Sequence, residues 1–99
     1  MPVPARKNLR LGLDYYEAGL GGYGLRPNTV AWARILAEGL PATPERIKRM
    51  YVWFAGHDNR IERSARRRKK ISPALVAWLL WGGDEGKRWA RKTRALIKG

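Results

Sequence analysis

The sequence predicts an all-α domain, a compact bundle of four to five short helices. Apolar residues recur at spacings of three and four, and alternation at a spacing of two is almost absent. Proline and glycine stand where helices are expected to start and stop. With 99 residues the chain has room for one domain. We therefore expect residues 1–99 to form a single basic helical domain with helix-turn-helix-like and helical-hairpin elements.

The first helix is expected from Val3 or Pro4 to Ala18. Its predicted apolar face is formed by Leu9, Leu13, Tyr16 and Leu20, which recur at i, i+4, i+7 and i+11. Four glycines between residues 19 and 24 should end this helix and form a turn.

Two helices should follow around a short connector of residues 40–43. The second is predicted to be capped by Asn28 or Thr29 and to end near Gly39. The third has a strong start signal in Thr43-Pro44-Glu45, where a capping hydroxyl precedes proline and an acid. This pair matches a helix-turn-helix, whose second helix carries basic residues near its start. The alternative is two ordinary packed helices joined through a glycine, which give the same pattern. Its candidate contact residues are Arg46, Arg49 and Trp53.

Residues 58–71 are predicted to form a mobile basic connector. Its positive side chains are Arg60, Arg63, Arg66, Arg67, Arg68, Lys69 and Lys70. Like charges at this density disfavour an isolated helix in water. The run from Arg66 to Lys70 is a candidate nucleic-acid arm; a charged linker is the alternative.

Ser72-Pro73 repeats the cap-then-proline signal and starts a fourth helix. Residues 74–81 are apolar on every side, so this helix should form the buried centre of the fold. Gly82-Gly83 should end it, and Asp84 is expected to cap a fifth helix. Such a short connection predicts a tight helical hairpin.

The fifth helix divides into two faces at 100° per residue. We expect Trp89, Thr93, Leu96 and Ile97 on the inner face, with Ala90 at its margin. The outer face is uniformly basic and consists of Lys87, Arg88, Arg91, Lys92, Arg94 and Lys98. No acidic residue follows Glu85, and a solvated face normally mixes charges of both signs.

The predicted core combines the apolar faces of these helices, and four of the five tryptophans are expected to contribute to it. Trp53 is the exception: it lies off the apolar stripe, one turn from Arg49, and is a candidate cation–π partner. The predicted core residues are Leu9, Leu13, Tyr16, Trp32, Leu36, Ile47, Met50, Phe54, Leu75, Trp78, Leu79, Trp89 and Leu96.

Composition excludes several classes of site. There is no cysteine and one histidine, so thiolate metal sites, disulfides and cysteine nucleophiles are excluded. His57 lies beside Asp58 but has no nearby nucleophile, so we expect no enzyme activity, no cofactor and no metal. No apolar run is long enough to span a membrane, and residues 1–7 lack the apolar centre of a signal peptide.

The net charge of +13 indicates a polyanionic partner. Nucleic acid is the commonest such partner. We expect non-enzymatic binding of duplex DNA, in preference to RNA, with weak sequence preference. The predicted contacts are Arg46, Arg49, Trp53, Arg66, Arg67, Arg68, Lys69, Lys70, Lys87, Arg88, Arg91, Lys92, Arg94 and Lys98.

Residues Ala77 to Ala90 carry a Trp-Gly-Gly-Asp-x-Gly turn between an apolar helix and a helix with Trp-Ala near its start. This stretch resembles a short tryptophan-rich module of phage and prophage proteins encoded near head and packaging genes. The resemblance implies that Trp81, Gly82, Gly83, Asp84, Gly86 and Trp89 determine the fold. It also supports the alternative function, a phage structural or assembly protein that docks on an acidic capsid or scaffold partner. Either function places the protein in the bacterial cytoplasm or within a virion. The Arg66–Lys70 run departs from the module, which has a longer and less basic connector.

Overall fold

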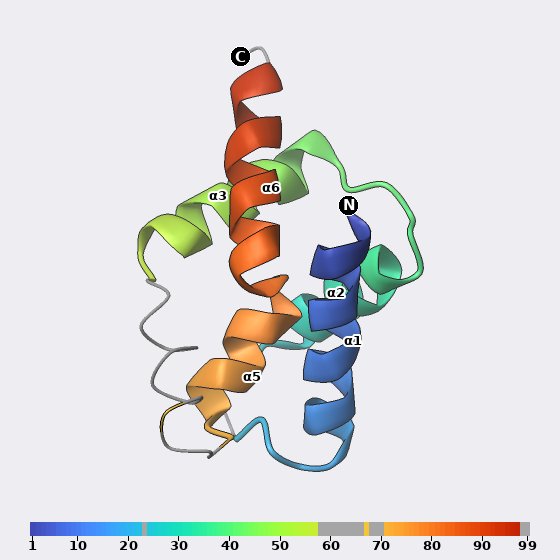
Figure 1. Cartoon of the computed structure of the whole chain (residues 1–99), viewed down its shortest axis with the longest axis vertical. Coiled ribbons are helices and arrows are strands. Elements are labelled where there is room, and N and C mark those ends of the chain that lie inside the picture. Colours follow the sequence, from blue (N-terminus) through green and yellow to red (C-terminus); the bar gives the residue numbers. More distant parts are fainter. Residues whose placement is uncertain (23, 58–66, 68–70, 98–99) are drawn as a thin grey trace.

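The computed structural model describes residues 1–22, 24–57, 67 and 71–97. This part of the chain is all-α, as the sequence predicts, and contains no strand (Figure 1). Its helices are α1 (Val3–Glu17), α2 (Pro27–Ala37), α3 (Pro44–Ala55), α5 (Pro73–Leu80) and α6 (Gly83–Leu96). The predicted connector of residues 58–71 lies outside the described residues except for Arg67 and Ile71.

Helices α3 and α5 begin where their capping signals predict. The Thr43 hydroxyl accepts a hydrogen bond from the backbone N–H of Arg46 at 3.1 Å. The Ser72 hydroxyl accepts one from the N–H of Leu75, also at 3.1 Å. In both helices proline occupies the first position, where its missing N–H costs nothing.

The predicted caps of α2 and α6 are wrong. Helix α2 begins at Pro27 with no side-chain cap, so Asn28 and Thr29 lie within its first turn. Helix α6 begins at Gly83 and is preceded by Gly82, whose φ of +115° is a conformation that L side chains rarely adopt. Asp84 therefore lies inside the first turn, and its carboxylate accepts a hydrogen bond from the indole Nε1–H of Trp78 at 3.2 Å.

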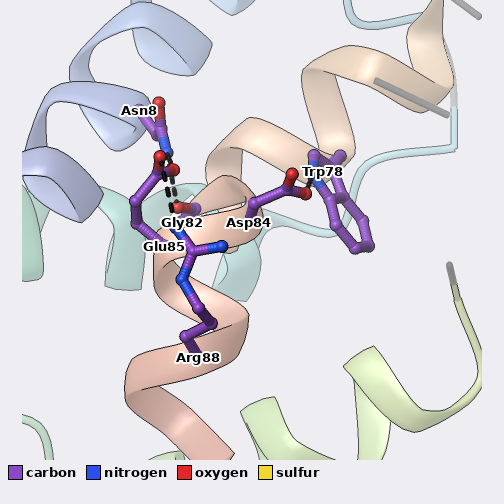
Figure 2. A network of polar contacts seen from close by, with 6 residues as sticks. All are labelled: Asn8, Trp78, Gly82, Asp84, Glu85 and Arg88. Carbon is purple, nitrogen blue, oxygen red and sulfur yellow. Dashed lines mark hydrogen bonds and ion pairs between the residues drawn. The ribbon is translucent and has the colours of Figure 1, made fainter. Parts of the chain in front are cut away.

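A polar network fixes the turn between α5 and α6 (Figure 2). The side-chain amide of Asn8, on α1, donates to the carbonyl oxygen of Gly82 at 2.9 Å and also to the carboxylate of Glu85. Glu85 in turn lies 3.6 Å from the guanidinium of Arg88. The side chain of Asn8 thus links α1 to the start of α6. Arg88 lies on the outer side of the turn.

The core is built around α5. Helix α1 packs along α5 and the start of α6, α2 packs on α1 and α5, and α3 packs on α6. The predicted hairpin is wrong, because α5 and α6 contact each other only near their turn. Figure 1 shows α6 continuing away from α5, with its C-terminal end projecting beyond the other helices.

Most of the predicted core is confirmed. The structure buries Leu9, Leu13, Leu36, Ile47, Met50, Phe54, Trp78 and Leu79. Leu75 is partly buried, and Trp32 and Trp89 are partly buried against the core cluster. Trp53, which was predicted to lie off the core, also packs against this cluster. Tyr16 and Leu96 were predicted to be core residues, but the structure exposes them, with relative exposures of 38% and 79%. Both lie in the last turn of their helix, and the end of α6 extends past the helices that would cover Leu96.

Candidate functional site

Helix α6 presents its basic residues on the side facing away from the core. Small residues at i, i+3 and i+7, namely Gly83, Gly86 and Ala90, form the buried side of this helix. The buried face of α6 is therefore rotated about the helix axis relative to the predicted inner face. Trp89 and Thr93 lie at the edge of this buried face and are half-buried. Among the predicted contacts, Arg88, Arg91 and Lys92 are exposed and Lys87 and Arg94 are half-buried.

Little negative charge is available to neutralise this outer face. Within the described residues, the one ion pair on α6 joins Arg88 to Glu85, and Glu85 also accepts from Asn8. No acidic residue follows Glu85 in the chain. The exposed Arg91 and Lys92, with the half-buried Arg94, thus form a positive surface along the projecting half of the helix.

The basic surface reaches two neighbouring helices. Lys87 and Arg91 line a hollow of about 60 Å³ against Tyr51 and Phe54 of α3. On the other side, Arg88 and Lys92 line a larger and more open depression of about 320 Å³ beside Pro2 and Pro4, at the start of α1. The ammonium of Lys87 lies 5.9 Å from the centroid of the Trp78 ring. The aliphatic part of the Lys87 side chain therefore lies along the core.

Arg46 was predicted as a surface contact, and the structure instead buries it to 5% relative exposure. Its guanidinium carbon lies 4.1 Å from the ring centroid of Trp81 and 5.5 Å from that of Trp32. Trp81 stacks in turn on Trp53, with centroids 4.9 Å apart and an interplanar angle of 12°. His57 stacks on Trp53 at 4.1 Å. We call Trp32, Arg46, Trp81, Trp53 and His57 the aromatic–arginine cluster.

The charge of Arg46 has no counterion in the described part of the chain. No carboxylate lies within ion-pair distance of it, and its Nε is buried without a hydrogen-bond partner. Burial, and then repulsion from Arg49, lowers the pKa of Arg46 to about 10. Arg46 is therefore charged at neutral pH, with the two indole rings as its main stabilising contacts.

A hollow of about 370 Å³ opens beside Arg46. Helix α2 contributes its first turn, α3 contributes one side, and the α5–α6 turn contributes Trp81. The polar and aromatic residues that matter here are Arg26, Thr29, Arg46, Arg49, Trp53 and Trp81. Arg49 is exposed, as predicted, and lies at this hollow and not on the α6 surface.

Sequence reasoning did not find this hollow, although one signal pointed to it. Arg46, Met50 and Trp53 are spaced i, i+4 and i+7, which places them on one side of α3. That spacing places Arg46 and Trp53 on the same wall of the hollow, whereas the indole rings that contact Arg46 are those of Trp32 and Trp81. Arg26, Thr29 and Trp81 come from distant segments, so their approach to Arg46 depends on tertiary structure.

Most of the predicted nucleic-acid arm, from Arg66 to Lys70, lies outside the residues that the structure describes. Arg66, Arg68, Lys69, Lys70 and Lys98 are not among the described residues, whereas Arg67 is described and exposed. Helices α2 and α3, the predicted helix-turn-helix pair, pack mainly on different partners: α2 on α1, and α3 on α6.

Comparisons with protein-family models, with curated proteins and with solved structures gave no match to this chain. None of the described helices combines the length and apolar character needed to cross a membrane. Within the described residues, acidic and histidine side chains do not cluster in a way that could hold a metal ion.

Proposed function

We propose that this protein is a non-enzymatic nucleic-acid-binding protein that contacts phosphates through the outer face of α6. One observation carries the proposal: the exposed Arg91 and Lys92, with Arg94, form a positive surface with no neighbouring acid on their helix. A phosphate backbone would supply the missing counterions, and release of its condensed cations would drive binding.

The composition of this face favours binding with weak sequence preference. Its polar side chains are lysine and arginine. Lysine contacts a phosphate as a point charge, and arginine can donate two parallel hydrogen bonds to it. Asn and Gln, which read adenine in the major groove, are absent from α6. Duplex DNA is the proposed ligand, since its regular backbone offers phosphates along the length of one protein helix; competition with an RNA duplex tests this choice.

Arg49 remains a candidate for a second contact zone, next to the hollow on α3. Arg46 is not part of the proposal, because the tryptophan rings on either side keep it from an extended ligand. Because Arg46 is buried between these rings, the proposal rests on α6 and not on the start of α3.

A matched pair of charge reversals tests the interface. Arg91→Glu changes the outer face of α6, whereas Lys7→Glu makes the same change in net charge on the exposed side of α1. Fluorescence anisotropy with short duplexes of unrelated sequence should show several-fold weaker binding for Arg91→Glu, and a salt slope reduced by about 1–2. Lys7→Glu should bind nearly as the wild type does.

Equal losses in the two variants would contradict a localised interface on α6. Absence of DNA binding by the wild type at physiological salt would contradict the proposal itself. It would favour the other function expected from the sequence, docking on an acidic phage capsid or scaffold protein.

A further inference from the structure

We propose that the hollow beside Arg46 is a binding site for a phosphate group, separate from the basic face of α6. The site would take a terminal phosphate, such as inorganic phosphate or the end of a phosphomonoester. This inference does not depend on the function proposed for α6, since the two sites use different residues.

The first argument is the buried, uncompensated charge of Arg46. A guanidinium removed from water ordinarily lies against a carboxylate or another acceptor. Here, among the described residues, Arg46 has only indole faces as partners, its Nε has no acceptor, and it is 5% exposed at the wall of an open hollow. An anion in the hollow would accept hydrogen bonds from the guanidinium and offset the cost of burying it.

The second argument is the convergence of further positive groups on the same space. Arg26 and Arg49 line the hollow from α2 and α3, and both side chains are exposed at its rim. The first turn of the 11-residue helix α2 also lines it, through Asn28 and Thr29. Pro27 has no N–H, and the N–H of Thr29 donates to the carbonyl of Arg26 at 3.0 Å, so this helix end contributes mainly its dipole, which favours a negative charge. Three arginines and this dipole together suit a doubly charged phosphate.

The aromatic walls indicate which part of a ligand is recognised. Trp53 is stacked between Trp81 and His57, and Trp81 between Trp53 and Arg46. These ring faces are already occupied, so the hollow offers no free face on which a base could stack. Recognition would therefore rest on the phosphate, and the volume of about 370 Å³ leaves room for an attached group.

Titration with inorganic phosphate at constant ionic strength tests the site. Trp53 and Trp81 line the hollow, so tryptophan fluorescence should respond, and calorimetry should give a saturable isotherm near one phosphate per chain.

Three variants locate the phosphate. Arg46→Lys should weaken phosphate binding at least tenfold, because lysine lacks the planar guanidinium that fits between the two indole rings. Arg26→Gln should weaken it several-fold without affecting folding, since that side chain is exposed. Arg91→Gln removes the same charge from α6 and should leave phosphate affinity within twofold.

No saturable phosphate binding by the wild type would overturn the proposal, and so would equal weakening by Arg26→Gln and Arg91→Gln. Should Arg46→Lys fail to fold, Arg26→Gln still decides the matter. A 5′-phosphorylated oligonucleotide compared with its 5′-hydroxyl form identifies the source: a preference for the former indicates a nucleic-acid end, and equal binding indicates a small free phosphoester. Loss of duplex binding in Arg91→Glu with phosphate binding intact would show that the two sites are independent.

Discussion

Trp78 is the side chain on which the core depends most. It is fully buried, contacts Phe54 edge-on at 5.1 Å, and donates its indole hydrogen to Asp84. We predict that Trp78→Ala lowers the free energy of unfolding by about 3–5 kcal/mol, the usual cost of truncating a large core residue. Chemical denaturation followed by circular dichroism measures this. A Trp78→Ala variant as stable as the wild type, but unable to bind DNA, would show that the ring serves a ligand and not the core.

The buried charge of Arg46 predicts a pH dependence of stability. Its pKa is lowered to about 10 in the folded chain, so burial of the charged form destabilises the native state at neutral pH. Above about pH 10 the unfolded chain binds more protons than the native state, so the stability contributed by this residue rises with pH.

We therefore expect the difference in unfolding free energy between the wild type and Arg46→Gln to be constant from pH 7 to 9. Above about pH 10 it should shift in favour of the wild type by up to about 1.4 kcal/mol per pH unit. Urea denaturation at each pH measures the difference, and lysine and tyrosine titration largely cancels between the two proteins. A difference that stays flat up to pH 11.5 would contradict the burial of an uncompensated charge.

At the scale of elements, the crossing of α1 and α5 depends on Gly12. A Cβ added there would lie 2.9 Å from the backbone nitrogen of Leu80 and 3.0 Å from the Cβ of Leu79. Backbone cannot move aside as a flexible side chain can, so Gly12→Ala should force the two helices apart. We predict a loss of about 1–3 kcal/mol, in spite of the higher helix propensity of alanine.

Gly24→Ala is the matched control, because a Cβ at Gly24 meets nothing within 4 Å. Thermal unfolding should show a clearly lower midpoint for Gly12→Ala and little change for Gly24→Ala. Equal midpoints would mean that α1 and α5 are not packed as closely as the structure places them.

The elements show where sequence reasoning succeeds and where it fails. Helices α3 and α5 start at Thr43-Pro44 and Ser72-Pro73 because capping is a local interaction, complete within four residues. The cap assigned to Asp84 is wrong because the helix begins before it: the N–H of Gly86 donates to the carbonyl of Gly82 at 2.9 Å, and the carboxylate of Asp84 accepts from Trp78 instead. The carbonyl of Gly82 also accepts from Asn8. Asn8 and Gly82 are 74 residues apart in the chain, so no local pattern indicates this contact.

At the scale of the molecule, the same distinction applies to the two candidate sites. The outer face of α6 follows from helical periodicity, and only its rotation was misjudged, because the small residues Gly86 and Ala90 allow a closer approach than Trp89 does. The hollow beside Arg46 assembles residues of α2, α3 and the α5–α6 turn. Its existence depends on how the helices pack, and the sequence showed only the spacing of Arg46 and Trp53.

The net charge of +13 favours a polyanionic ligand, and the salt dependence of DNA binding tests this most directly. The measurement is the affinity of the whole chain for unrelated duplexes across a series of salt concentrations. If about six phosphates are neutralised, the plot of log affinity against log salt should have a slope near −5, with similar affinities for each duplex. A slope near zero, or no binding at physiological salt, would contradict the account of α6 as a nucleic-acid interface.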